Sequence, residues 1–216
     1  MKTKTTRATV ALLLATVATF IAACGDNNSS SSHSGMNGMD HGSGSMTSTK
    51  PAKAGNVDQA FVSQMIPHHQ MAVHMAKMAR STGEHAEIQA LAKDIVSAQT
   101  SEISQLEAIA KRIDVTPAAM GAEDLMTSDA KTLGLSMDEM GMSMDMSMLM
   151  DAKPFDRAFI DMMIPHHQGA IRMARAELSK GTDPELQKIA TAIVAAQTKE
   201  IKQMNSWRKA WYGRCV

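Results

Sequence analysis

After residue 55 the apolar positions of the chain recur every three or four residues, which is the period of an amphipathic helix. The pattern breaks at Gly83, where a turn is expected, and then resumes. It predicts one helix over about residues 58–80, capped by Asp58, and a second over about residues 84–112. Pro67 lies inside the first helix and is expected to kink or restart it.

The same pattern occurs twice along the chain. The segment from residue 58 to residue 106 matches the segment that starts at Asp156 without a gap, with about half of the positions identical. The segment FVSQMIPHHQMAVHMA aligns with FIDMMIPHHQGAIRMA, and IVSAQTSEISQL aligns with IVAAQTKEIKQM. The second half of the later repeat opens with Asp183 as a cap and Pro184 in the first turn. The repeat indicates one helical hairpin used twice.

Two hairpins supply four long helices, and the economical way to bury their apolar stripes is an all-α four-helix bundle. We expect the hairpins over residues 56–114 and 154–212, joined by a methionine-rich crossover over residues 115–153. Residues 24–55 consist mainly of Ser, Gly, Asn, Met and His, with almost no branched apolar side chain. Such a segment cannot bury a core and is predicted to be a disordered tether.

The apolar stripe of the second helix continues into polar residues. Its spacing leads from Ile88 and Ile95 to Gln99 and Glu102, which therefore face the core. The second hairpin repeats this arrangement at the equivalent positions, Gln197 and Glu200. An unpaired carboxylate inside a bundle costs several kcal/mol, so these side chains require partners.

The first helix of each hairpin supplies imidazole and thioether groups as partners. Helical spacing gathers them on one broad face, formed by Met65, His68, His69 and Met75 and, in the second hairpin, by Met163, His166, His167 and Met173. The inward glutamates and glutamines are then expected to hold a histidine in one tautomer and orientation, or the glutamates to bind an ion directly. The alternative is a polar network that only locks the helix register.

Two imidazoles and two thioethers on one face, present twice, favour a metal site. Thioether sulfur is a soft donor that binds Cu(I) and Ag(I), while imidazole also accepts Cu(II), Ni and Zn. Methionine has no proton to lose and cannot be lost to disulfide formation, which suits an oxidising compartment. Copper is therefore the predicted ion, with Cu(I) favoured and Cu(II) or Ag(I) as alternatives.

Methionine is the outstanding residue of the composition, with 21 residues beside 8 histidines. The crossover segment SMDEMGMSMDMSMLM contains seven of them, Met137, Met140, Met142, Met144, Met146, Met148 and Met150. Near-strict alternation is also a strand pattern, but Ser, Asp and Gly intervene and methionine is not a strand former. We interpret the tract as a flexible, solvated segment that wraps soft ions and exchanges them quickly.

The N-terminus has the pattern of a secretory signal, with three basic residues before an uncharged apolar run. The run ends in IAAC, which resembles the lipobox of bacterial lipoproteins. We expect residues 1–23 to be removed and Cys24 to be lipidated, which anchors the protein in the cell envelope or periplasm. The alternative is an ordinary cleaved signal that leaves Cys24 as a thiol; either places the protein outside the cytoplasm.

Charge and aromatic content argue against a nucleic-acid binder. Lys and Arg number 22, Asp and Glu also number 22, and only 3% of residues are aromatic. Two cysteines cannot form a disulfide framework or a four-cysteine metal site. The expected partners are metal ions, copper-transport or copper-oxidising proteins, and the membrane through the lipid anchor.

The blocks MIPHHQMAVHMA and MMIPHHQGAIRMA, with QTSEI and QTKEI after them, resemble the domain of unknown function 305 family over roughly residues 56–212. The resemblance implies a ferritin-like four-helix bundle and, for some members, periplasmic copper binding through Met and His. The repeats differ here, because Gly169, Arg172 and Ala176 stand where the first repeat has Met71, His74 and Met78. The first repeat therefore carries more candidate ligands, including Met71 and His74.

These features predict an extracytoplasmic copper-binding protein that sequesters or relays copper, in homeostasis or resistance, without catalytic turnover. One alternative is a ferritin-like metal-dependent oxidoreductase, although the Glu-x-x-His pairs of di-iron bundles are absent from the four core helices. The other alternative is a structural lipoprotein whose methionines only fill space.

Overall fold

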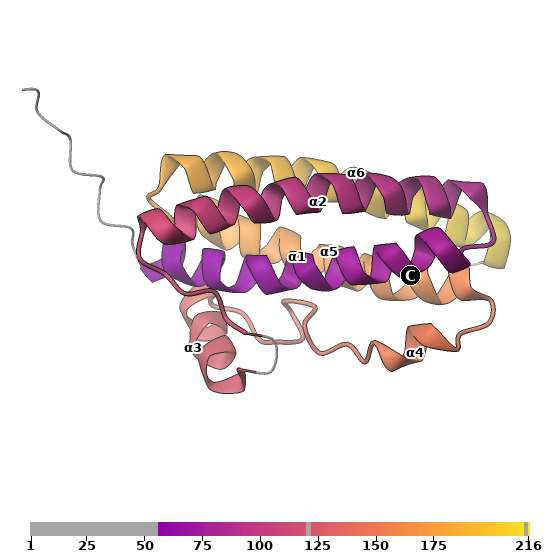
Figure 1. Cartoon of the computed structure of the whole chain (residues 1–216), viewed down its shortest axis with the longest axis horizontal. Helices are drawn as coiled ribbons and strands as arrows, with labels where there is room; N and C mark the ends of the chain where they lie inside the picture. Colours follow the sequence, from indigo (N-terminus) through magenta and orange to yellow (C-terminus); the bar gives the residue numbers. More distant parts are fainter. Residues whose placement is uncertain (1–55, 120–121, 214–215) are drawn as a thin grey trace, which may run out of the picture. The chain divides into compact units, whose positions relative to one another are not determined.

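The computed structural model describes residues 56–119, 122–213 and 216. Over these residues the chain is all-α, as predicted, with helices in the order α1 (Asn56–Thr82), α2 (Ala86–Arg112), α3 (Glu123–Leu133), α4 (Ser147–Met150), α5 (Phe155–Lys180) and α6 (Pro184–Tyr212) (Figure 1). The predicted signal peptide, Cys24 and the tether lie outside the described residues. Within the described part, none of the helices has the length and apolar character that a membrane crossing requires.

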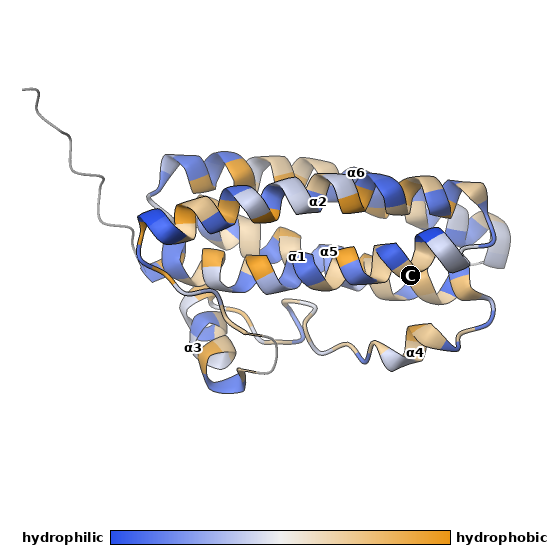
Figure 2. Cartoon of the chain, viewed as in Figure 1, coloured by the Kyte–Doolittle hydropathy of each residue, from blue (hydrophilic) through white to orange (hydrophobic). Residues whose placement is uncertain are grey.

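The four long helices form the predicted bundle of two hairpins. Helix α1 packs along α2, α5 packs along α6, and the hairpins meet mainly where α1 lies against α5 (Figure 1). Hydrophobic residues recur along each helix between hydrophilic ones (Figure 2). The largest fully buried side chains include Phe61, Phe159, Ile88, Ile95 and Leu106, so the core lies between the two hairpins as the apolar stripes require.

Pro67 does not restart the first helix, because α1 runs through it without a break. A proline cannot donate to the carbonyl four residues earlier, which here belongs to Ser63. The backbone N–H of Ala118, at the start of the crossover, donates to that carbonyl oxygen at 3.1 Å. The crossover thus satisfies the acceptor that the proline leaves free.

The two aspartates at the start of the repeats cap the opposite hairpin. Asp58 lies within α1 instead of capping it, and its carboxylate accepts from the backbone N–H and the hydroxyl of Thr182, each at 2.8 Å. Asp156, in α5, accepts from the backbone N–H groups of Glu84 and His85 at 2.9 and 2.8 Å. Each carboxylate therefore ties the first helix of one hairpin to the turn of the other.

The crossover is folded against the bundle and differs from the solvated tract that its composition predicts. It forms α3, a series of turns and the short α4, and it follows one side of the bundle (Figure 1). The side chains of Met140 and Leu149 are fully buried. Strand structure is absent from its described residues as well. Burial of these apolar side chains outweighs the polar spacing residues between them.

Candidate metal centre

The two histidine pairs meet where the hairpins meet. His68 and His69 lie in α1, His166 and His167 lie in α5, and all four are fully buried. The imidazole of His68 packs against that of His166, with ring centroids 3.7 Å apart and an angle of 36° between the planes. One histidine of each pair thus faces the partner hairpin, which brings imidazole groups from both repeats into one place.

The second histidine of each pair contacts the glutamate of its own hairpin. Nε2 of His69 lies 2.8 Å from Oε2 of Glu102, and Nε2 of His167 lies 2.7 Å from Oε2 of Glu200. Each glutamate side chain is only 17% exposed. The sequence indicated these contacts, and the structure forms the same pair in both repeats.

These contacts determine which ring nitrogen carries the proton. A carbonyl or carboxylate oxygen accepts, so Nε2 of His69 and of His167 donates to its glutamate, and Nε2 of His68 donates to the carbonyl oxygen of Met140 at 3.0 Å. In a neutral imidazole, Nδ1 then carries the lone pair. In metal sites the ring N–H opposite the ligating nitrogen is usually held in this way.

The remaining ring nitrogens are buried without a hydrogen-bond partner among the described residues. They are Nδ1 of His68, His69 and His167 and both nitrogens of His166. Native proteins rarely bury a polar atom without a partner, because the lost hydration costs about 1–3 kcal/mol for each group. The unpartnered nitrogens of His68 and His166, whose rings pack against each other, fit a cation shared by the two hairpins.

Burial keeps the central histidines neutral. The pKa of His68 and that of His166 lie well below the usual value, first because burial disfavours the charged ring and then because neighbouring histidines repel a further charge. At neutral pH both rings therefore offer lone pairs. A metal ion at this site would compete with few protons.

The remaining predicted core residues lie on the same inward faces. The side chains of Met65, Met75, Met163 and Met173 are fully buried, and Gln99 and Gln197 are each 3% exposed. The Oε1 atoms of both glutamines are also buried without a hydrogen-bond partner in the described part of the chain. Thioether and amide groups therefore share the core with the imidazoles.

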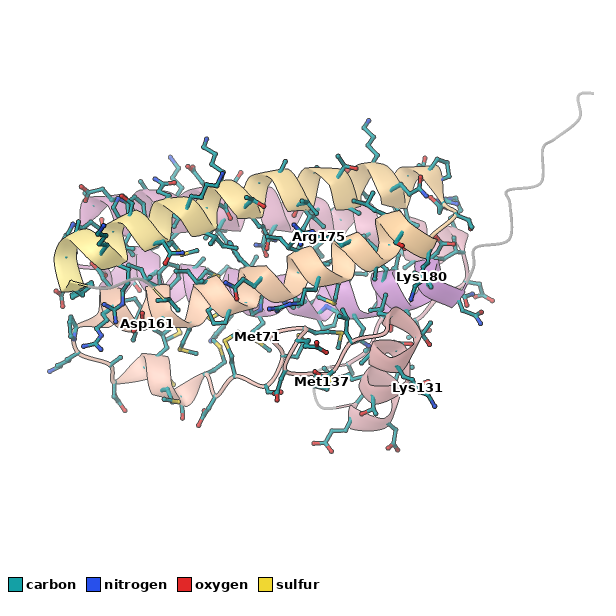
Figure 3. The ribbon with its side chains drawn as sticks, turned by 180° about the vertical axis from the view of Figure 1, so that it is seen from behind. Met71, Lys131, Met137, Asp161, Arg175 and Lys180 are labelled. Carbon is teal, nitrogen blue, oxygen red and sulfur yellow. The ribbon has the colours of Figure 1, made fainter. Side chains whose placement is uncertain are left out.

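The other candidate ligands lie outside this core. His74 is exposed, and the side chains of Met148 and Met150 are 71% and 68% exposed. Met137, Met144 and Met146 are partly buried, whereas Met71, Met140 and Met142 are buried. Sulfur atoms are drawn along the crossover in the view that labels Met71 and Met137 (Figure 3). The candidate metal ligands outside the histidine pairs therefore include both buried and exposed side chains.

Among the described residues there is no group of three or more His, Cys, Asp or Glu side chains that could hold a metal ion. This part of the chain therefore forms neither a site rich in carboxylates, as hard cations prefer, nor a site of three imidazoles. Any ion at the histidine pairs would have neutral nitrogen ligands, with thioether sulfur as the other donor type nearby in the core.

One contact of the site was not foreseen from the sequence, namely the carbonyl oxygen of Met140 on His68. A backbone acceptor leaves no mark on the side-chain pattern. A signal was nevertheless present: Gly169 occupies the middle of a predicted helix, where the first repeat has Met71. A glycine inside a helix is unfavourable and often marks a close approach of another backbone.

Comparison with known proteins places this arrangement in a family. The model of the family described as Domain of unknown function (DUF305) matches residues 12–110 and 58–208. The chain belongs to the DUF305 family. This confirms the resemblance carried by the two HHQ blocks and by the QTSEI and QTKEI segments.

Solved DUF305-like structures share the fold. CopM in its Cu(I)-bound form is 35% identical, with a TM-score of 0.59 over 72% of this chain and 98% of that chain. CopM has also been solved in Cu(II)-bound, Ag-bound and apo forms. A DUF305 protein of Streptomyces coelicolor is 23% identical, with a TM-score of 0.65 over 74% of this chain and 96% of that chain, and it supports the fold alone.

A shorter match involves the uncharacterized protein L153 of Acanthamoeba polyphaga mimivirus. The two sequences are 39% identical over 51 residues, which is 24% of this chain and 34% of that protein. The match therefore covers about a third of that relative's length.

Proposed function

We propose that this protein binds copper as Cu(I) in the bundle core and sequesters or relays it outside the cytoplasm. The single observation that carries the proposal is the packing of His68 from one hairpin against His166 from the other, both buried and both with ring nitrogens that lack a hydrogen-bond partner among the described residues. The ε N–H groups of His68, His69 and His167 are held by Met140, Glu102 and Glu200. The free nitrogens are the ones that would hold the ion.

The chemistry of these donors favours a soft monovalent ion. Imidazole and thioether are neutral and polarisable, and they bind Cu(I) and Ag(I) better than they bind hard cations. Glu102 and Glu200 lie one hydrogen bond from the rings and supply negative charge without coordinating the ion. The likeness to CopM, a protein solved with Cu(I), Cu(II) and Ag, supports copper or silver as the ion without choosing the oxidation state. Cu(II) and Ag(I) remain the alternative ions.

The role outside the cytoplasm rests on the N-terminal pattern. A signal sequence that ends in the lipobox-like IAAC would expose the bundle in the cell envelope, anchored through Cys24. The crossover methionines, from the exposed Met148 to the buried Met140, offer thioether groups at graded depth. They suit capture of an ion at the surface and hand-over to a copper-transport or copper-oxidising partner.

The oxidoreductase alternative has no support in the described residues. Ferritin-like di-iron chemistry uses several carboxylates with histidines around two metals. The two glutamates beside the histidines, Glu102 and Glu200, are each hydrogen-bonded to a histidine. Metal oxidation therefore lacks the ligand set that it requires.

A competition titration tests the proposal. The protein is titrated with Cu(I) under anaerobic conditions against a chromophoric Cu(I) chelator. His68→Ala with His166→Ala is compared with wild type, and His74→Ala, which changes an exposed histidine of the same helix, is the control. We expect wild type and control to take copper from the chelator and the double variant to lose most of this uptake. Wild type that takes up no copper, or a helical double variant that binds like wild type, would refute the proposal.

A further inference from the structure

The two repeats differ at the positions where the crossover packs. Gly169 and Arg172 in α5 correspond to Met71 and His74 in α1. The crossover turn formed by residues 139–142 lies against α5 at these substituted positions. The sequence differences therefore fall where the 139–142 turn packs on α5.

Gly169 allows the backbone of the turn to approach α5. A Cβ atom at Gly169 would lie 1.9 Å from the carbonyl oxygen of Met140, far inside any allowed contact. Gly141, at φ +70°, brings the turn equally close, because a Cβ there would lie 3.0 Å from Cα of His166 and 3.0 Å from the oxygen of Pro165. No other residue type at position 169 permits this packing without a shift.

Arg172 holds the same turn from the outside. Its Nη1 donates to the carbonyl oxygen of Glu139 at 2.8 Å. The N–H of Met142 donates to the oxygen of Met137 at 3.1 Å and closes the turn internally. The carbonyl of Met140, which lies between these two contacts, accepts from Nε2 of His68. A short chain of contacts thus leads from Gly169 and Arg172 to a histidine of the core.

We propose that Gly169 and Arg172 are positioning residues that seat the 139–142 turn on the histidine cluster. Seated there, the turn fixes the tautomer of His68 through the Met140 carbonyl and closes the cluster on the α5 side. The ion then reaches and leaves the histidines when the turn lifts. The statement about the ion rests on the proposed function, whereas the statement about the tautomer does not.

The position of the turn gives the two central histidines, His68 and His166, different hydrogen bonds. His68 has a backbone acceptor for its ε N–H, while both ring nitrogens of His166 have no hydrogen-bond partner among the described residues. Met140 is fully buried and Met142 is 8% exposed, so the side chains of two methionines of the turn point into the protein. The 139–142 turn therefore packs on α5 but provides its hydrogen-bond acceptor to the histidine of α1.

Two variants test the proposal, each with a metal-free and a metal-loaded measurement. Gly169→Ala inserts the forbidden Cβ, and Arg172→Ala removes the outer contact. Arg175→Ala, which changes an exposed arginine one turn further along α5, is the control. The metal-free readout is the ¹⁵N chemical shifts of the His68 ring, which distinguish the two neutral tautomers. The metal-loaded readout is the rate at which Cu(I) passes to a chromophoric chelator.

We expect both variants to lower the population of the Nε2–H tautomer of His68 and to release Cu(I) about ten- to a hundred-fold faster, while the control matches wild type. Arg172→Lys, which retains a donor, is expected to restore part of the effect. Variants that keep the wild-type ring shifts and the wild-type release rate would overturn the proposal. The ¹⁵N shifts of the His68 ring are recorded on the metal-free protein. If the protein binds no copper, the proposed function is refuted, but these shifts still test whether Gly169 and Arg172 position the turn.

Discussion

The imidazole of His68 lies on that of His166 with 3.7 Å between ring centroids, although the two residues belong to different repeats. Burial keeps both rings neutral, so the contact is not an ion pair. Burying ring nitrogens without hydrogen-bond partners costs free energy. The proposed cation, bound by both repeats, would offset this cost and would explain why the two rings lie so close together.

Glu102 tests whether a hydrogen bond outside the ligand shell sets the affinity of the site. Replacing Glu102 with Gln keeps the shape of the side chain and removes its charge from Nε2 of His69. We expect Cu(I) affinity to fall about ten- to a hundred-fold, as happens when a partner that orients a metal-binding histidine is lost. Chelator competition measures the change, with Glu107→Gln on the exposed side of α2 as control. An unchanged Cu(I) affinity would contradict this prediction and would indicate that Glu102 only fixes the register of the two helices.

Met140 and Met148 test whether the crossover is part of the folded core. Met140 is fully buried and Met148 is 71% exposed. Met140→Ala is therefore expected to lower the free energy of unfolding by about 2–5 kcal/mol, whereas Met148→Ala changes it by less than about 0.5 kcal/mol. Urea unfolding of the metal-free protein gives both values. Equal small effects would show that the tract is solvated after all.

Glu177 makes stability depend on pH. Its carboxyl is fully buried, and burial, followed by a hydrogen bond with Asp58 and the charges of Asp58 and Asp183, raises its pKa to about 8, well above the ordinary value of a glutamate. Folding therefore favours the protonated form, and the stability present below the unfolded pKa is lost as the pH rises toward 8. Glu177→Gln is expected to remove this part of the decline.

Chemical unfolding at several pH values between about 5 and 9 measures that decline. Glu107→Gln, on an exposed carboxylate, serves as the control. The same pH slope in Glu177→Gln as in wild type would contradict the assignment.

Asp156 tests the link between the hairpins. Its carboxylate accepts from two backbone N–H groups and lies 2.6 Å from Nδ1 of His85, whose ring stacks on Trp211 at 3.8 Å. Asp156→Ala is expected to destabilise the protein by about 1–3 kcal/mol, because two backbone N–H groups and His85 lose a buried, charged acceptor. Tryptophan fluorescence should change at the same time, as the stacked ring moves. Asp151→Ala, at an exposed position, should do neither.

The sequence was sufficient for the elements and for the pairing within each hairpin. The repeat predicted two helical hairpins, and helical spacing predicted that the inward glutamate of each hairpin contacts one of its two histidines. The structure shows that these histidines are His69 and His167. The interruption at Gly83 marked the turn. These features follow from period and spacing alone, which are local properties of the chain.

The contacts between the two hairpins could not be predicted from the sequence pattern. Periodicity says that His68 faces inward, but it does not say that His166 is its neighbour, because that depends on which helices of the two hairpins touch. For the same reason Asp58, expected to cap its own helix, caps the other hairpin instead. The folded crossover was also missed, since polar spacers mask how deeply Met140 is buried.

The most direct measurement is a crystal structure of the Cu(I)-loaded protein with anomalous diffraction recorded on both sides of the copper absorption edge. We predict an anomalous peak inside the bundle within bonding distance of ring nitrogens from both His68 and His166. Anomalous peaks confined to the crossover methionines or to the protein surface, with the four core histidines free of copper, would contradict the central claim.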